Sequence, residues 1–368
     1  MTQRLPPTLT PLDVALAGLL NELQPVAPIA LPLAEALGCI AAEMPALKPL
    51  PPHDVAVVDG WALRANDLVG ASSYSPLPLT ALPTWVESGD AMPAGCDCVL
   101  DADAVATAGP ISEVLTEGIP GQGVRRAGSD IAAGASVVVP GTQIHAADLM
   151  LARAAGMETL NVRRPRLRIV NMPHGGVSAR LIADHARTCG AQIVEVEAGA
   201  RDAASITHAL DAAACDLLLL VGGTGVGRED AAITALAARG EVLAHGIALE
   251  PGRTAATGRL RAVPVIALPG APDHAFATWL ALARSVLDRL SARRQQNAVT
   301  LPLARKIASS VGVAEVALLA EQAGTWLPLA IGALPLQSIA RADAWLIVLG
   351  DSEGFAADTP VDAYLLRE

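Results

Sequence analysis

Aromatic side chains are scarce in this sequence: phenylalanine, tryptophan and tyrosine together make up 2% of its 368 residues. Few rings are therefore available to stack on bases, and Leu, Val, Ile and Ala must fill the core. Basic residues are also in the minority, with 26 Lys and Arg against 37 Asp and Glu, which gives a net charge of -11. Both shortages argue against a nucleic-acid-binding protein.

Cysteine pairs and long apolar runs are missing as well. The five cysteines are spread along the chain, and only Cys96 and Cys98 are close in sequence, so neither a disulfide framework nor a zinc site is indicated. No segment reaches the roughly 18 apolar residues of a membrane span. Asp13 and Glu22 interrupt the apolar stretch near the N-terminus, unlike in a signal peptide. We expect a soluble, cytoplasmic protein without membrane contacts.

What the sequence does have is a composition that favours several folded domains. Hydrophobic residues make up 52% and charged residues 17%, which excludes disorder as the main state. The length favours two or more domains. Changes in pattern predict an α/β multidomain protein with a helical N-terminal part, a small β-rich unit from about Pro76 to Gly141, an α/β domain and a C-terminal β domain.

The α/β domain has the clearest pattern. Strands and helices alternate from Arg166 onward, and Leu217–Val221 is apolar throughout, as expected of a strand buried on both faces. This alternation predicts a three-layer domain with a parallel sheet between helices. The expected elements include helices over 178–189, from 229 and over 273–290, strands over 242–249 and 263–268, and, in the linking domain, a helical stripe over 31–42.

Three loops of the α/β domain are candidate binding sites, because ligands of such sheets bind beyond the carboxyl ends of the strands. Gly222–Asp230 contains four glycines, so backbone N–H groups can approach an anion, and the following helix would add positive charge. Glu250–Thr254 and Leu268–Pro272 follow two further predicted strands. Arg228 and Arg253 could bind the same anion, or they could be ordinary surface residues.

The Gly222–Asp230 loop lacks the signatures of the common nucleotide-binding loops. No Gly-Lys-Ser/Thr follows it, and its glycines do not have the G-x-G-x-x-G spacing. No G-x-S-x-G motif for a nucleophilic serine occurs. The loop therefore indicates a phosphate site of another kind, or a tight turn in which Asp230 favours the start of a helix.

Six segments in this order resemble motifs of the molybdopterin molybdenumtransferase family, which comprises the MoeA proteins and the E domain of gephyrin. The segments are Val55–Arg64, Glu87–Asp97, Arg125–Gly134, Val221–Asp230, Glu250–Thr254 and Leu268–Pro272. The resemblance implies an elongated homodimer whose α/β domain binds adenylated molybdopterin. It implies four domains in each subunit: a helical linking domain (1–50 with 124–164), a small β-rich domain (51–123), the α/β domain (165–292) and a C-terminal β domain (298–368). It also implies molybdate as second substrate, Mg²⁺ as cofactor, release of AMP on metal insertion, and a possible molybdoenzyme client.

The resemblance also implies roles for single residues. Asp59, Asp130 and Asp230 match acidic positions of the family and would be catalytic, with Asp59 and Asp230 holding the metal. Ser88 stands where the family has Thr. The remaining predicted ligand-binding residues come from the three loops: Gly222, Gly223, Thr224, Gly225, Gly227, Arg228, Pro251, Gly252, Arg253, Pro269 and Gly270.

The sequence departs from the family pattern at charged positions. The family's T-G-D-E-L corresponds to residues 172–176, which contain no acid, and Glu250 replaces a lysine. Two hypotheses follow: a divergent molybdenumtransferase, or a catalytically degenerate molybdopterin-binding protein that acts as carrier, sensor or accessory factor. An unrelated nucleotide-binding protein would explain the glycine loop but not the ordered motifs of the first 140 residues.

Overall fold

The computed structural model describes residues 3–80, 83–108, 111–173, 175–210 and 215–366. The chain divides into two compact units. The larger unit consists of Met1–Glu43, Val139–Ala146 and Thr159–Glu368, and the smaller unit consists of Met44–Val138 and Ala147–Glu158. The limits of the four domains expected from sequence stay a prediction.

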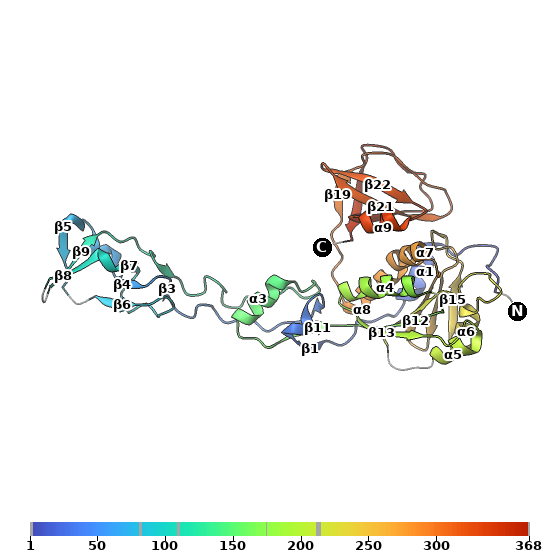
Figure 1. Cartoon of the computed structure of the whole chain (residues 1–368), viewed down its shortest axis with the longest axis horizontal. Helices are drawn as coiled ribbons and strands as arrows, with labels where there is room; N and C mark the ends of the chain where they lie inside the picture. The colour runs from blue at the N-terminus through green and yellow to red at the C-terminus, as the bar shows by residue number, and fades with distance from the viewer. Residues whose placement is uncertain (1–2, 81–82, 109–110, 174, 211–214, 367–368) are drawn as a thin grey trace. The chain divides into compact units, whose positions relative to one another are not determined.

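A six-stranded sheet is the centre of the larger unit (Figure 1). Its strands, in order across the sheet, are β13 (Gln192–Glu197), β12 (Arg166–Asn171), β14 (Leu217–Val221), β18 (Val263–Leu268), β17 (Ala256–Leu260) and β15 (Glu241–His245). The first four are parallel to one another, and β17 is antiparallel to both of its neighbours. The predicted α/β fold is confirmed, and the antiparallel β17 is a strand that the sequence pattern did not predict.

Helices cover both faces of this sheet (Figure 1). Alternate residues of β14 show why the strand is apolar throughout: Leu217 and Leu219 belong to one buried cluster, and Leu218 and Leu220 to the other. One face is covered by α1 (Leu12–Leu20), α4 (Gly176–Thr188), α7 (Pro272–Thr278), a π-helical turn (Trp279–Ala283) and α8 (Arg284–Ser291). The other is covered by α5 (Ala203–Ala209) and α6 (Ala232–Arg239).

Three predicted elements are corrected by the structure. Residues 31–42 are not one helix: β1 (Ile29–Pro32) and β2 (Ile40–Ala41) flank the four-residue α2 (Leu33–Ala36), because both strands pair with β11 (Thr159–Arg163). The helix expected from residue 229 begins at Ala232, after a longer loop. The strand expected over 242–249 is split at Gly246, whose φ of +83° makes a turn, so that β15 ends at His245.

A second six-stranded sheet forms the C-terminal part of the larger unit. It consists of β16 (Leu249–Glu250), β21 (Ala314–Gln322), β23 (Ala344–Val348), β25 (Pro360–Leu365) and β19 (Val299–Pro302), and β22 (Thr325–Ile331) pairs with β21. Short β20 (Ile307–Ala308) pairs with β24 (Gly354–Phe355), and α9 (Leu336–Arg341) lies between β22 and β23 in the chain. Val316, Leu318 and Trp345 of this sheet belong to the same buried cluster as α7 and α8.

The smaller unit is β-rich. Its strands are β3 (Val55–Ala56), β4 (Gly60–Leu63), β5 (Ser72–Pro78), β6 (Thr84–Val86), β7 (Cys98–Leu100), β8 (Val105–Ala108), β9 (Ile111–Thr116) and β10 (Val124–Arg125). Two three-stranded sheets, β6-β4-β7 and β5-β9-β8, enclose its buried clusters. The short helices Ala65–Leu68 and Ala102–Ala104 connect strands, and α3 (Ala146–Ala154) is contributed mainly by the second segment of the unit.

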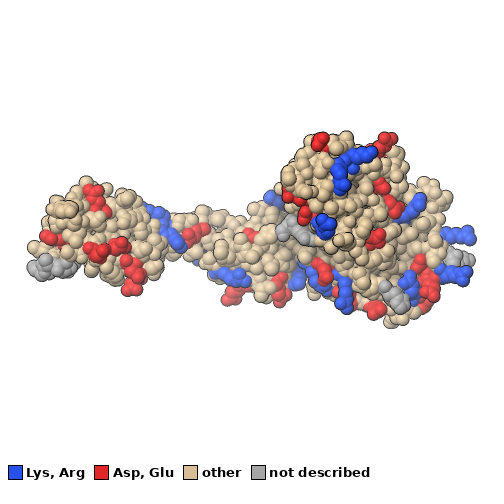
Figure 2. Space-filling view, turned by 45° about the horizontal axis from the view of Figure 1, so that its top comes forward, with Lys and Arg blue, Asp and Glu red and all other residues tan. Residues whose placement is uncertain are grey.

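Two further observations concern the charge of the surface and the character of the helices. On the face shown in Figure 2, Lys and Arg side chains are dispersed among Asp and Glu and form no continuous basic area. None of the helices within the described ranges combines the length and the apolar character needed to cross a membrane.

Candidate functional site

The candidate site lies at one edge of the α/β sheet, where β14 and β18 end side by side. The glycine loop that follows β14 contacts the loop that follows β18: the Gly222 N–H donates to the Leu268 carbonyl at 2.9 Å. A Cβ atom on Gly270 would lie 3.5 Å from the Gly222 Cα. The structure therefore brings these two predicted loops together through glycine backbone. The buried Ser178 hydroxyl of α4 adds a bond of 2.7 Å to the Gly270 carbonyl.

The third predicted loop reaches the same edge by a different route. Glu250 belongs to β16, which pairs with β21 of the C-terminal sheet, so this loop does not follow a strand of the α/β sheet as expected. It leads instead into β17, whose first residue, Ala256, pairs with Ala267 near the end of β18. Because β17 is antiparallel, its beginning lies where its parallel neighbours end.

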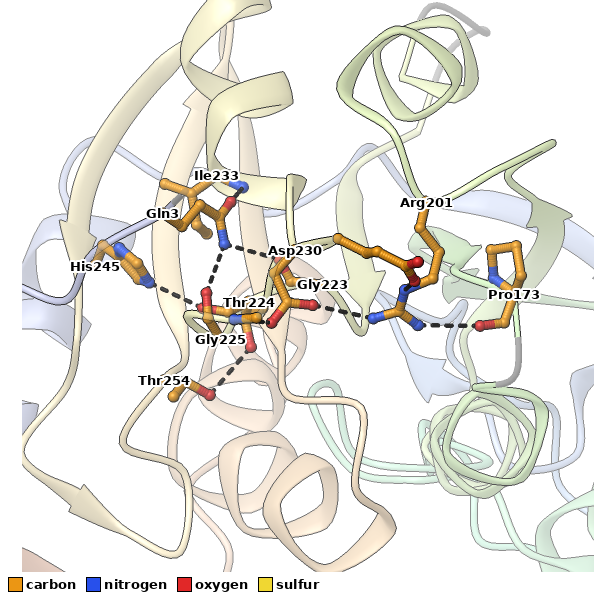
Figure 3. Close-up of polar contacts among 12 residues, drawn as sticks. Gln3, Pro173, Arg201, Gly223, Thr224, Gly225, Asp230, Ile233, His245 and Thr254 are labelled. Atoms are coloured by element: carbon orange, nitrogen blue, oxygen red, sulfur yellow. Dashed lines mark hydrogen bonds and ion pairs between the residues drawn. The ribbon is translucent and has the colours of Figure 1, made fainter. Parts of the chain in front are cut away.

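Gln3 holds the glycine loop in place from the N-terminal segment (Figure 3). Its side-chain amide donates to the carbonyls of Gly223 (3.0 Å) and Gly225 (2.8 Å) and accepts from the N–H groups of Ile233 (2.8 Å) and Thr234 (3.4 Å). Gln3 is 8% exposed. The first turn of α6 is therefore capped by protein, which corrects the expectation that the N-terminus of this helix would face the anion.

Three backbone donors of the loop are left for a ligand. Within the described part of the chain, the N–H groups of Gly223, Thr224 and Gly225 have no hydrogen-bond acceptor. Consecutive N–H groups of this kind form a concave anion site. The Gly227 N–H, by contrast, donates to the carboxylate of Asp230 at 3.0 Å.

Thr224 connects the glycine loop to the loop before β17 (Figure 3). Its hydroxyl lies 3.1 Å from the hydroxyl of Thr254, and its carbonyl lies 3.0 Å from Nε2 of His245 at the end of β15. Thr224 is 2% exposed. Neither Thr254 nor His245 was among the predicted site residues; glycine spacing gives no sign of them.

Asp230 binds an arginine that the sequence did not indicate as a site residue (Figure 3). The Arg201 guanidinium donates to Asp230 Oδ1 at 3.0 Å and to the Pro173 carbonyl at 3.1 Å, and its Nε lies 4.0 Å from the Glu229 carboxylate. The side chains of Arg201 and Asp230 are 30% and 17% exposed. This partial burial strengthens the attraction between the two charges.

Next to Arg201, Asp202 caps α5. Its carboxylate accepts from the N–H groups of Ala204 and Ser205 and from the Ser205 hydroxyl, at 2.8 to 3.0 Å. The N–H and hydroxyl of Ser205 hold the pKa of the Asp202 carboxyl below its usual range. The cap therefore fixes the backbone beside Arg201 while the Asp202 carboxyl is ionised.

Arg253 of the third predicted loop is exposed. It lines a cavity of about 1140 Å³ between the α/β sheet's helices and the C-terminal sheet, as do Arg284 and Trp345. Arg284 in turn donates to the Gln296 side chain at 2.6 Å. Arg228 is exposed, and Pro251, Gly252 and Pro269 are buried. Arg253 therefore lines this cavity, whereas Thr254, the next residue in sequence, contacts the glycine loop.

The remaining predicted residues belong to the smaller unit. The Ser88 N–H donates to Asp59 Oδ1 at 2.8 Å and the Ser88 hydroxyl to the Val57 carbonyl at 3.3 Å, so the structure brings these two predicted residues together on an exposed turn. Asp130 forms an exposed ion pair with Arg125 at 3.1 Å. The roles of Asp59, Ser88 and Asp130 stay predictions.

Comparisons with known proteins agree with the fold and with the motif order. Residues 10–156 match a family model described as MoeA N-terminal region (domain I and II), and residues 176–289 match one described as probable molybdopterin binding domain. A Mycobacterium tuberculosis protein named molybdopterin molybdenumtransferase 2 is 29% identical over 306 residues, which cover 71% of this chain and 74% of the relative. A putative molybdopterin biosynthesis protein of Methanocaldococcus jannaschii is 24% identical and covers 91% of each chain.

The solved structure of a molybdopterin biosynthesis MoeA protein from Pyrococcus horikoshii has the same fold. It is superimposed with a TM-score of 0.76 at 22% identity, covering 98% of this chain and 100% of the other. The matched models together extend over both compact units and include the glycine loop. The ordered motifs, both family models and the shared fold show that this chain belongs to the MoeA family.

Proposed function

We propose that this protein is a molybdopterin molybdenumtransferase that binds adenylated molybdopterin, inserts molybdenum from molybdate and releases AMP. The proposal rests on one observation: the N–H groups of Gly223, Thr224 and Gly225, which have no acceptor among the described residues, lie in the loop whose Asp230 binds Arg201. Backbone donors beside a guanidinium suit a phosphate group. This loop lies within the segment that matches the molybdopterin-binding family model.

The enzyme is favoured over the degenerate binding protein. Relatives that align with 71% to 93% of this chain are named molybdopterin molybdenumtransferases. In this proposal the protein is a cytoplasmic homodimer that passes its product to a molybdoenzyme, as the resemblance implies. Asp59, Asp130 and Asp230 act on the reacting groups, and the three loops bind the ligand.

The magnesium ion implied by the resemblance does not fit Asp230. A magnesium ion prefers free carboxylate oxygens and water, and the two Asp230 oxygens accept from Arg201 and from the Gly227 N–H. The described residues contain no group of three or more His, Cys, Asp or Glu that could hold a metal ion. Asp59 alone remains the predicted metal ligand.

The proposal is tested by following AMP release from adenylated molybdopterin with and without molybdate. Molybdate-dependent release is expected from the unmodified protein. Asp59→Asn should lower turnover at least about tenfold while changing ligand affinity less. Asp230→Asn should lower turnover at least about tenfold and also weaken binding, because it removes the anionic partner of Arg201. Asp67→Asn, at an exposed aspartate of the smaller unit, is the matched control. Tight binding without any AMP release would contradict the proposal and favour a carrier or sensor.

A further inference from the structure

Arg201 is the one cation among the described residues that hydrogen-bonds to two loops of the candidate site. It lies in the connection between β13 and α5 and joins the turn after β12, through the Pro173 carbonyl, to Asp230 in the glycine loop (Figure 3). The sequence from 172 to 183 contains no Asp or Glu. The turn that Arg201 contacts through the Pro173 carbonyl therefore lacks both acids of the family pattern.

The other acids near Arg201 are also unavailable or too exposed to hold a divalent cation. The Asp202 oxygens accept from the backbone and the hydroxyl of Ser205 and from the backbone of Ala204. Glu229 is 81% exposed and has Arg201 as its nearest charged partner, at 4.0 Å. A divalent cation placed against Asp230 would have to displace Arg201 or lie beside its positive charge.

We infer that Arg201 supplies the positive charge of this site in place of a divalent cation, so that the phosphate of the ligand is bound without magnesium. The inference rests on the proposed function. A guanidinium stays protonated throughout the physiological range and offers five N–H donors in a fixed plane. Two of these donors are used by Pro173 and Asp230, and the side chain is 30% exposed, so donors remain for a ligand oxygen.

In this arrangement Asp230 is a positioning residue for Arg201, and Arg201 is positioned for the ligand. The Gly227 N–H holds one Asp230 oxygen and Arg201 holds the other. The acid and the guanidinium thus form one unit whose geometry is set by the backbone of two loops. Arg201 and the three N–H groups of the glycine loop would together bind a multiply charged oxyanion.

The test compares the affinity for adenylated molybdopterin in EDTA and in excess MgCl₂, measured by fluorescence titration. For the unmodified protein we expect the dissociation constants in the two buffers to agree within about twofold. For Arg201→Gln we expect the affinity to fall roughly tenfold to a hundredfold in both buffers. Arg201→Lys keeps the charge but loses the planar set of donors, so its affinity should lie between those of the unmodified protein and Arg201→Gln. Arg261→Gln, at the β17–β18 turn on the opposite edge of the sheet, should bind like the unmodified protein.

Binding at least about tenfold tighter in MgCl₂ than in EDTA would overturn the inference while leaving the proposed function intact. Absence of binding in both buffers would instead refute the proposed function. For that case, Mn²⁺ titration followed by electron paramagnetic resonance tests the inference without any ligand. We expect the unmodified protein and Asp230→Asn to bind Mn²⁺ equally. A Mn²⁺ site that is present in the unmodified protein and lost in Asp230→Asn would show that Asp230 holds a metal ion after all.

Discussion

Single side chains determine the conformation of the glycine loop, and Gln3 does so from 220 residues away in sequence. One amide group satisfies two carbonyls of the loop and two N–H groups of α6. A buried backbone group without a partner is costly. The glycine loop is therefore stabilised by a residue that lies outside every motif found in the sequence.

Replacing Gln3 by alanine should destabilise the larger unit by about 1–3 kcal/mol, because buried donors and acceptors lose their partner. Gln3→Glu should be at least as harmful, since a carboxylate cannot donate to the carbonyls of Gly223 and Gly225. Urea unfolding followed by tryptophan fluorescence measures both effects. Gln322→Ala, at an exposed strand end, is the control. An unchanged midpoint for both Gln3 variants would contradict this role.

Two glycines at the loop junction should respond differently to alanine. Gly222 has a φ of +96°, and a Cβ there would lie 3.2 Å from the Met172 Cβ, so Gly222→Ala should cost about 1–3 kcal/mol. Gly270 has a compatible backbone and would place its Cβ at ordinary contact distance, so Gly270→Ala should change stability by less than about 0.5 kcal/mol. Urea unfolding of both variants tests the difference, and equal losses would show that backbone conformation is not the cause.

Sequence motifs predicted the conformation of the backbone and contacts between residues close in sequence, but not contacts between distant side chains. The sequence predicted that the Gly222–Asp230 and Leu268–Pro272 loops lie at one edge of the sheet, and the structure adds that they are in contact there. Gln3 and Arg201 were not predicted, and Thr254 was predicted only as the end of a candidate loop, because their partners are 28 or more residues away in sequence. Which side chain reaches Asp230 depends on how separate loops are folded together.

At the scale of elements, the short helix α5 depends on its first residue. Asp202 lies directly after Arg201 at the Ncap position of α5, where its side chain accepts from the N–H groups of Ala204 and Ser205. A short helix has few hydrogen bonds of its own and depends on its cap and its packing. The position of Arg201 is therefore sensitive to the state of the Asp202 carboxyl.

Because the pKa of Asp202 is lowered in the folded protein, its contribution to stability should be complete above the unfolded-state pKa of about 3.9 and lost as the pH falls through the folded pKa. Amide NMR signals of Ala204 and Ser205 should shift in that acidic range. Asp202→Asn keeps a capping oxygen but cannot titrate, so its signals should be independent of pH there. Identical titration curves for both proteins would assign the change to another group.

Sequence patterns predicted elements best where the pattern was long and local. The apolar strand β14 and the helix α4, which ends near Gly190 with its φ of +81°, are found as expected. The strand predicted over 242–249 was wrong in its second half, because the chain turns at Gly246 and Leu249 pairs with the C-terminal sheet. An apolar run shows that a strand is buried but not which sheet buries it.

At the scale of the whole molecule, each compact unit has buried clusters of its own. The α/β domain and the C-terminal sheet share one cluster, which includes Trp279, Leu287 and Trp345. Residues in one packed core unfold together, whereas domains with separate cores unfold independently. The larger unit should therefore unfold as one body, separately from the smaller unit.

Scanning calorimetry should accordingly show two transitions. Trp61 and Trp85, which pack edge to face at 5.1 Å, report on the smaller unit, and the other three tryptophans lie in the larger unit. In the double variant W61F/W85F, tryptophan fluorescence should follow only one of the two calorimetric transitions. A single calorimetric transition that coincides with this fluorescence change would mean that the two units unfold cooperatively.

The sequence by itself determined the α/β class, the family, the order of the motifs and the loops that meet beyond β14 and β18. These depend on hydrophobic periodicity and on glycine and proline positions, which act over a few residues. Only the tertiary structure decided that Gln3 caps α6, that Arg201 binds Asp230 and that Arg253 lines a cavity whereas Thr254 contacts Thr224. Such contacts join segments far apart in the chain, and they exist only once packing has brought those segments together.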